Sequence, residues 1–137
     1  MDFKRLQPLG LLAMRLSLGA IMIAHGYMKV FGGLRGHEEF IAHLGIPVWM
    51  AYLSTATEFA GGIAIVLGLF TRFFSLAFFI EMLVAIWKVH WKHGLTAPGG
   101  FEGPMAFATI AFALMCFGAG PYALRFGGGS SGWGGKK

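Results

Sequence analysis

Three charged residues interrupt long apolar stretches of the sequence: Arg15, Glu58 and Glu81. Ionisable groups inside membrane segments usually face the interior of a bundle and pair with one another. At a rise of about 1.5 Å per helical residue, the depths of Arg15, Glu58 and Glu81 are roughly 9, 16 and 12 Å. Each depth is measured from the end of its segment that is predicted to lie on the same side of the membrane. One guanidinium can bind two carboxylates, so we predict a buried polar cluster of Arg15, Glu58 and Glu81.

A cluster of this kind allows three kinds of chemistry. It could be a latch that fixes the register of the helices and takes part in no reaction. It could bind a ligand or a redox cofactor, or it could carry protons or ions through a carboxylate that gains and loses a proton. The sequence does not decide between these three roles of the cluster. It identifies no catalytic residue and does not show which carboxylate is ionised.

A second group of polar and aromatic residues stands near the other ends of these stretches. Aromatic walls with a histidine and a lysine could receive a quinone head group, whose carbonyl oxygens accept hydrogen bonds. Two histidines on different helices could ligate a haem, although no spacing here is typical of a metal site. The alternative is that these side chains only anchor helix ends at the membrane interface. The candidate ligand-binding residues are His25, Lys29, Trp87, His90 and Glu102.

Four apolar stretches carry these residues, and we expect each to be a membrane-spanning helix. A helix needs roughly 20 residues to cross a hydrocarbon core of about 30 Å. The first three stretches are long enough, whereas the fourth is short and needs cover from flanking residues or neighbouring helices. Open strands cannot cross a bilayer. The predicted fold is therefore all-α, an integral membrane bundle of four transmembrane helices over residues 9–31, 48–70, 73–91 and 104–118.

The composition supports a membrane protein. Of the 137 residues, 56% are hydrophobic and only 12% are charged, against about 25% charged in average soluble domains. A soluble fold of this size could not hide so much apolar surface. The net charge is +5, but the basic residues are scattered between apolar blocks, which argues against nucleic-acid binding. The single cysteine, Cys116, cannot form an internal disulfide, and we interpret it as a packing residue.

Helical periodicity predicts which faces of the first three helices are buried. Residues three and four apart share a face, and small residues beside each charge allow close helix packing in membranes. The first predicted face contains Arg15, Gly19, Met22, Gly26 and Lys29. The second contains Ala51, Thr55, Glu58, Gly62 and Ile65. The third contains Ala77, Glu81, Ala85 and Lys88.

The connectors indicate topology and orientation. The short turn at Thr71 and Arg72 predicts that the second and third helices are antiparallel neighbours. The start of the chain lacks a cleavage signal after its apolar run, so we expect that helix to be retained. We predict one transmembrane domain over residues 1–125 and a disordered, Gly/Ser-rich cytoplasmic tail over residues 126–137. Lysine and arginine favour the side with both termini by six to four, which places both ends in the cytoplasm.

Several short motifs, in order, carry a resemblance to a known family. Besides Arg15, they are His25-Gly26-Tyr27-Met28-Lys29, Gly45-Ile46-Pro47, Glu58-Phe59-Ala60-Gly61-Gly62, Leu67-Gly68-Leu69-Phe70-Thr71-Arg72 and Glu81-Met82. Each motif is short, but their order and spacing over residues 9–124 are fairly specific. The sequence resembles the DoxX family of small bacterial membrane proteins.

The resemblance implies a four-helix membrane fold and a location in the bacterial plasma membrane. Its namesakes are associated with thiosulfate:quinone oxidoreductase, and other members with membrane redox and oxidative-stress complexes. The family often ends its last helix with Gly-Pro-Gly and a later Ser-Leu-Asp. Here the stretch from Gly118 to Arg125 contains no aspartate, so any role of that residue does not carry over.

Together these features predict an accessory membrane subunit of a quinone-linked or oxidative-stress redox system. The chain has no flavin, nucleotide or iron–sulfur motif, so electrons would come from a partner protein and any enzyme activity would belong to the complex. The other expected partner is the lipid bilayer, and a homo-oligomer is left open. The alternatives are a small transporter that uses the buried carboxylates and a purely structural membrane subunit.

Overall fold

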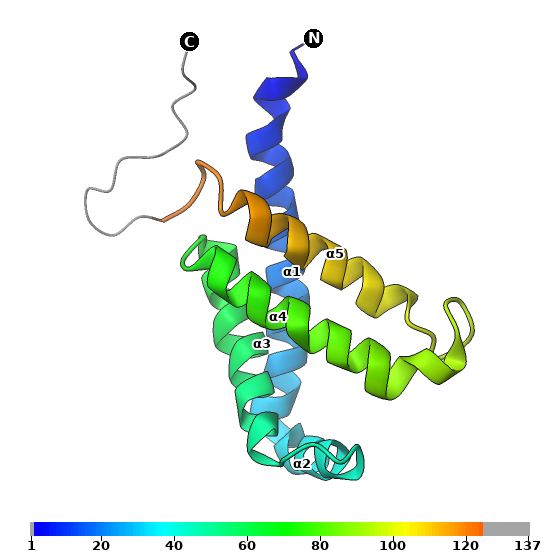
Figure 1. Ribbon diagram of the computed structural model, residues 1–137. Coiled ribbons are helices and arrows are strands. Elements are labelled where there is room, and N and C mark those ends of the chain that lie inside the picture. Colours follow the sequence, from blue (N-terminus) through cyan, green and yellow to red (C-terminus); the bar gives the residue numbers. More distant parts are fainter. Residues whose placement is uncertain (1, 125–137) are drawn as a thin grey trace.

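The computed structural model describes residues 2–124, and every regular element in that range is helical. A short 3₁₀ turn at Phe3–Leu6 leads into the first long helix. The α-helices are α1 (Gln7–Met28), α2 (Leu34–His43), α3 (Trp49–Leu67), α4 (Thr71–Ala85) and α5 (Glu102–Phe117) (Figure 1). Helical turns at Ile86–His90 and Trp91–His93 prolong α4. The predicted all-α fold is confirmed, and the predicted tail, residues 126–137, lies outside the described residues.

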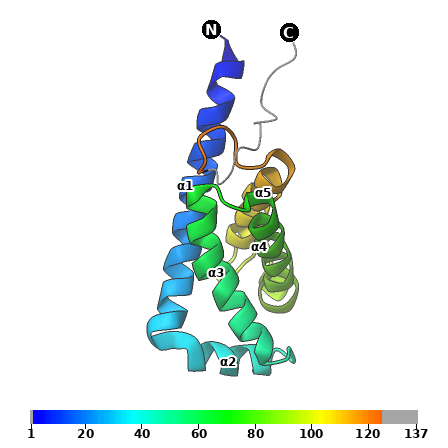
Figure 2. The same cartoon turned by 90° about the vertical axis from the view of Figure 1, so that its left-hand side faces the viewer.

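The four long helices form two layers. Helix α1 packs mainly against α3, and α4 packs mainly against α5, so the two pairs lie face to face (Figure 2). Helix α2 crosses one end of the first layer (Figure 1). The start of α1 and the segment that follows α5 lie toward the opposite end (Figure 1). We call these the α2 end and the terminal end. Helices α3 and α4 are joined by a tight turn and run antiparallel, as the sequence predicts.

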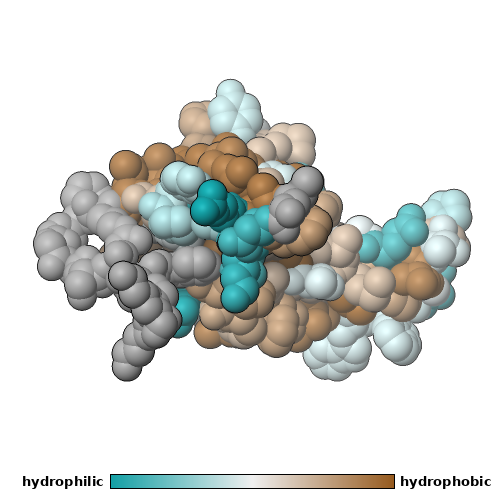
Figure 3. Space-filling view, turned by 90° about the horizontal axis from the view of Figure 1, so that it is seen from above, coloured by the Kyte–Doolittle hydropathy of each residue, from teal (hydrophilic) through white to brown (hydrophobic). Residues whose placement is uncertain are grey.

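The outer surface of the bundle is apolar, as a membrane protein requires. Helix α3, the α1–α2 run and α4 with its extension are each long and apolar enough to cross a membrane, whereas α5 has only 16 residues. Seen from the terminal end, hydrophilic residues gather near the middle and apolar residues surround them (Figure 3). Trp49, Trp87 and Trp91 are 63–68% exposed, as aromatic residues at a membrane interface are.

Glycines allow α1 and α3 to approach closely. A Cβ atom on Gly26 would lie 2.5 Å from the Phe59 backbone nitrogen, and one on Gly62 would lie 2.9 Å from the Ile23 backbone nitrogen. One on Gly19 would lie 2.9 Å from the Gly62 carbonyl oxygen. No other residue fits these positions without moving a helix backbone, which is the small-residue packing typical of membrane helices.

Two of the three predicted buried faces are confirmed, and the third is confirmed in part. On α1 the predicted residues are buried, except that Lys29 is half-buried, and on α3 all five are buried. On α4 the predicted Ala77, Glu81 and Ala85 are half-buried and Lys88 is exposed, whereas the fully buried residues are Thr71, Ser75 and Phe78. Helix α4 packs against α5 as well as α3, so its most buried face is turned about one residue away from the predicted one.

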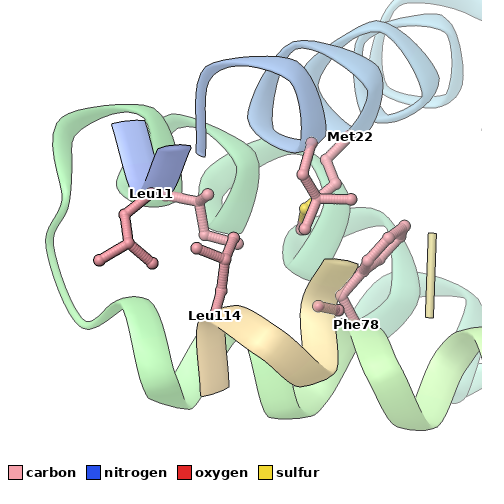
Figure 4. Packing of buried hydrophobic residues seen from close by; sticks show 7 residues of the cluster. Leu11, Met22, Phe78 and Leu114 are labelled. Carbon is pink, nitrogen blue, oxygen red and sulfur yellow. The ribbon is translucent and has the colours of Figure 1, made fainter. Parts of the chain in front are cut away.

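A purely apolar core joins the two layers. Leu11 and Met22 of α1 point toward Leu114 of α5 and Phe78 of α4 (Figure 4). The cluster is completed by Leu18, Ile65 and Ala111. Along α1, Leu18 and Met22 lie between Arg15 and Lys29, which are about 21 Å apart on the helix axis. The apolar core therefore separates the charged groups of the two ends.

The sequence indicates only a connector at residues 32–36, whereas residues 34–36 open α2. The backbone leaves helical geometry at Phe31 and Gly32, and the chain turns there into α2. Leu34, His37, Ile41 and Leu44 are half-buried at three- and four-residue intervals. This is the pattern of a short amphipathic helix, and α2 is too short and too polar to span a membrane.

We expect Gly26→Ala to destabilise the protein by about 1–3 kcal/mol, the usual cost of overpacking, because the new methyl group would meet the Phe59 backbone. Thermal unfolding in detergent, followed by circular dichroism, would measure this. Gly10→Ala is the matched control in the same helix, since nothing lies within 4 Å of its added Cβ. It should be neutral or slightly stabilising, and equal losses for both variants would contradict the packing argument.

Candidate functional site

Arg15 does not join Glu58 and Glu81. Its guanidinium donates hydrogen bonds to backbone carbonyls only: Nε to Ile65 O at 3.0 Å, Nη2 to Val66 O at 2.8 Å and Nη1 to Ala119 O at 3.0 Å. Nη1 also donates to the Tyr122 carbonyl. The predicted three-residue cluster is therefore wrong in its arginine.

The physical reason is that the last carbonyls of a helix lack partners and carry partial negative charge. Arg15 is only 1% exposed, and its fork of N–H groups matches the free carbonyls at the end of α3. The same guanidinium fixes the segment after α5 to α3, and Leu124 N donates to Leu67 O at 2.9 Å beside it. Arg15 is thus a structural fastener at the terminal end.

The buried carboxylate of α3 pairs with a lysine instead. Lys29 Nζ lies 2.7 Å from Glu58 Oε2, and the two side chains are 21% and 5% exposed. Lys29 directly follows the last residue of α1, where the close contact between Gly26 and Phe59 brings α1 against α3. Removing one partner of a buried pair is costly because the other charge stays buried, so this ion pair holds the two helices together.

Glu81 brings α4 to the same place. Its Oε1 accepts a hydrogen bond from the Ser54 hydroxyl of α3, and its carboxyl also faces that of Glu58 at hydrogen-bonding range. Two carboxyl groups thus lie close together beside one lysine in the buried interior. The structure therefore brings Glu58 and Glu81 together, as the sequence predicts.

His37 of α2 completes the group, although the sequence does not mark it as a site residue. It is close enough to Lys29 and Glu58 for their charges to act on it. Its Nε2 is buried and has no hydrogen-bond partner among the described residues. The only sequence signal was the amphipathic spacing of α2. We call Lys29, His37, Ser54, Glu58 and Glu81 the carboxylate site.

The carboxylate site has unused hydrogen-bonding capacity. Glu81 Oε2 is buried without a partner in residues 2–124. Glu58 Oε2 meets the Lys29 ammonium as an ion pair but accepts no well-directed hydrogen bond. Buried polar groups are normally satisfied, so a carboxyl oxygen of Glu81 and an imidazole nitrogen of His37, both without hydrogen-bond partners in residues 2–124, are suited to a small polar ligand.

The other predicted ligand-binding residues lie outside the carboxylate site. His25 and Glu102 are exposed. Trp87 is 68% exposed, and Lys88 Nζ lies 4.4 Å from its ring centre. His90 Nδ1 bonds to the Gly99 carbonyl oxygen at 2.7 Å, which ties the loop before α5 to the end of α4. Of that predicted group, only Lys29 is in the site. No group of three or more histidine, cysteine or acidic residues that could hold a metal is found within residues 2–124.

The family profile described as DoxX matches residues 10–91, more than half of the chain. The chain belongs to the DoxX family. The matched range of this DoxX protein includes every residue of the carboxylate site. No solved structure matches the chain at a significant level.

Curated relatives come from two bacteria. The DoxX protein is 32% identical to a Bacillus subtilis protein named "Putative oxidoreductase CatD", over 77% of this chain and 78% of the relative. It is 29% identical to the inner membrane protein YqjF of Escherichia coli, over 77% and 92%. It is 34% identical to the inner membrane protein YphA of the same organism, over 60% and 59%.

We expect Lys29→Met to destabilise the protein by about 3–5 kcal/mol, because it leaves the Glu58 charge buried and unpaired. The double variant Lys29→Met/Glu58→Gln should recover most of this loss, since neither charge remains. Thermal or denaturant unfolding in detergent would give the coupling between the two sites. Additive effects of the two substitutions would show that the ion pair does not act as described.

We expect Arg15→Gln to cost about 3 kcal/mol or more, because several buried carbonyls lose their donors. Hydrogen exchange should rise at the end of α3 and over residues 119–124 and stay unchanged near Glu58. Arg5→Gln is the matched control, because Arg5 is 89% exposed. Faster exchange at Glu58 in the Arg15 variant would contradict the separation of the two ends.

Proposed function

We propose that this DoxX protein is the quinone-binding membrane subunit of a bacterial redox complex. One observation carries the proposal: a lysine, a histidine and two carboxyl groups converge inside the membrane domain with hydrogen-bonding capacity left over. Ligand sites of this kind combine apolar walls with a few convergent polar groups. A quinone head group is small, polar at its two oxygens and carried by a lipid-soluble tail.

The residues of the carboxylate site suit both forms of such a ligand. A quinone supplies two-electron, two-proton redox chemistry when bound. Its carbonyl oxygens would accept hydrogen bonds from the Lys29 ammonium and an imidazole N–H of His37. A hydroxyl of the reduced form would donate to the free Oε2 of Glu81. The chain itself would bind the head group, orient it and hold the protons.

Access to the site favours a lipid-soluble ligand. Lys29 is the most exposed member of the ion pair, and it lies next to the break between α1 and α2. Beside it runs a row of rings: Tyr27 and Phe31 are 4.7 Å apart, and Phe31 and Phe59 are 6.2 Å apart between ring centres. Tyr27 and Phe31 are more than half exposed, so an apolar tail in the bilayer could lie against them.

The partners and location belong to the same proposal. The sequence carries no nucleotide-binding or iron–sulfur motif, so electrons would come from a partner subunit. The name of CatD associates a relative with oxidoreductase chemistry, and the names of YqjF and YphA support the bacterial inner membrane. The excess of basic residues on the side of the termini supports cytoplasmic ends, which would put α2 and the carboxylate site toward the outer face.

The structure favours this function over transport. A proton or cation carrier needs polar groups along the whole path. Between the carboxylate site and Arg15 the interior is filled by Leu18, Met22, Ile65 and Phe78, which are at most 1% exposed. The buried hydroxyls of Ser75 and Thr71 also lie on that side, but Ser75 is about 9 Å along α4 from Glu81, so the described residues leave a gap in any polar route toward the terminal end.

The test is direct quinone binding. The full chain, purified in mild detergent, should retain a quinone detectable by mass spectrometry of extracted lipids. It should also bind added ubiquinone or menaquinone, followed by quenching of tryptophan fluorescence. In Glu81→Gln the affinity for the reduced form should fall about tenfold, because one charge-assisted hydrogen bond is lost.

His25→Gln is the control, since His25 is exposed and outside the carboxylate site. It should bind like the wild type. Size-exclusion chromatography would confirm that each variant remains folded. A folded wild-type protein that neither retains nor binds either quinone would overturn the proposed function.

A further inference from the structure

The carboxylate site lies directly beneath α2. Helix α2 crosses the α2 end of the bundle (Figures 1 and 2). Its inner face carries His37, which is half-buried, and its outer face exposes Arg35, Glu39 and His43. One surface helix thus has a titratable group turned toward the buried carboxylates and charged groups turned away from them.

His37 is placed to pass protons between these two environments. The charged groups that face it are Lys29 at the end of α1 and Glu58 of α3, and Glu58 in turn faces Glu81 of α4. The next residue of α2, Glu38, is engaged with Tyr52. Imidazole can accept a proton on one nitrogen and release one from the other. The buried Nε2 has no hydrogen-bond partner among the described residues, so it can take part in proton transfer without first breaking a hydrogen bond to one of them.

Toward the terminal end the described interior is mainly apolar, with the buried hydroxyls of Ser75 and Thr71 as its polar groups on α4. Leu18, Met22, Ile65 and Phe78 fill the interior on that side of the carboxylates. The nearest hydroxyl of α4 in that direction is Ser75, about 9 Å along the helix from Glu81, too far for direct proton transfer. Beyond the core, Arg15 has no acceptor atom and does not release its proton.

We propose that the carboxylate site exchanges protons with one face of the membrane only, the face on which α2 lies, and that His37 is the relay. This inference adds to the quinone site the membrane face with which protons are exchanged and the residue that transfers them. It rests on the proposed function only for the use of the protons. Proton exchange itself involves no electron transfer. When bound quinone accepts two electrons from the partner subunit, the two protons that it takes up to become quinol would enter through the α2 face.

The experiment uses the full chain in sealed liposomes sorted by orientation through an affinity tag on the amino terminus. The pH outside is stepped within milliseconds, and the infrared band of the protonated carboxyl pair is followed, assigned by its loss in Glu81→Gln. Liposomes with α2 outward should respond at once. Liposomes with α2 inward should respond only as protons leak across the lipid, and a protonophore should remove the difference.

His37→Gln in the α2-outward liposomes should slow the response by about a hundredfold, the usual contribution of a positioned proton-transfer group. His25→Gln, the exposed histidine of α1, should respond like the wild type. A purely structural role of His37 would not change this rate in a variant that remains folded. If His37→Gln does not fold, the wild-type comparison of the two orientations still decides whether exchange is one-sided.

Two results would overturn the proposal: prompt responses in both orientations, or a folded His37→Gln protein that responds as fast as the wild type. The proposed function fails separately. One-sided exchange in a protein that binds no quinone would refute the quinone site and leave the relay standing. Quinone binding together with proton exchange from both faces would refute the one-sided relay and leave the quinone site standing.

Discussion

In hydrocarbon a charged side chain has no water to stabilise it, so each one needs a partner supplied by the fold. The Lys29–Glu58 ion pair, 2.7 Å long, meets that need at the α2 end, and the arrangement around it depends on it. It joins the last turn of α1 to the middle of α3. That position allows Ser54 to reach Glu81 on α4, and it places the chain break from which α2 starts. His37 then comes to lie beside the pair.

The close packing of α1 on α3 makes this ion pair possible. Gly26 lies one turn before Lys29, and its missing side chain lets the helix touch the backbone at Phe59, the residue next to Glu58. A larger residue at position 26 would move the lysine away from the carboxylate. The small-residue seam and the ion pair are therefore one feature: backbone contact sets the distance, and the charges fix the register.

The two ends of the bundle show how the same requirement gives different results. At the terminal end, the donors of Arg15 meet backbone carbonyls from α3 and from the segment after α5. The Arg15 guanidinium is engaged in hydrogen bonds to these carbonyls, and its role is to stabilise the fold. At the α2 end, one lysine faces two carboxyl groups, and polar atoms remain without partners. Excess polar capacity inside a membrane domain costs stability, which supports a ligand or a mobile proton there. The apolar core keeps the two ends separate.

The sequence by itself determined the membrane location, the four long helices and the buried faces of α1 and α3, because apolar length and helical period are local properties of the chain. The DoxX resemblance drawn from its motifs is confirmed, and the burial of Glu58 beside Glu81 also followed from depth and spacing. Only the tertiary structure decided the partners of the buried charges. Arg15 binds backbone carbonyls, which leave no trace in residue types. His37 depends on a chain break at Phe31 and Gly32, and the rotation of α4 depends on its packing against α5, so neither could be predicted from one sequence.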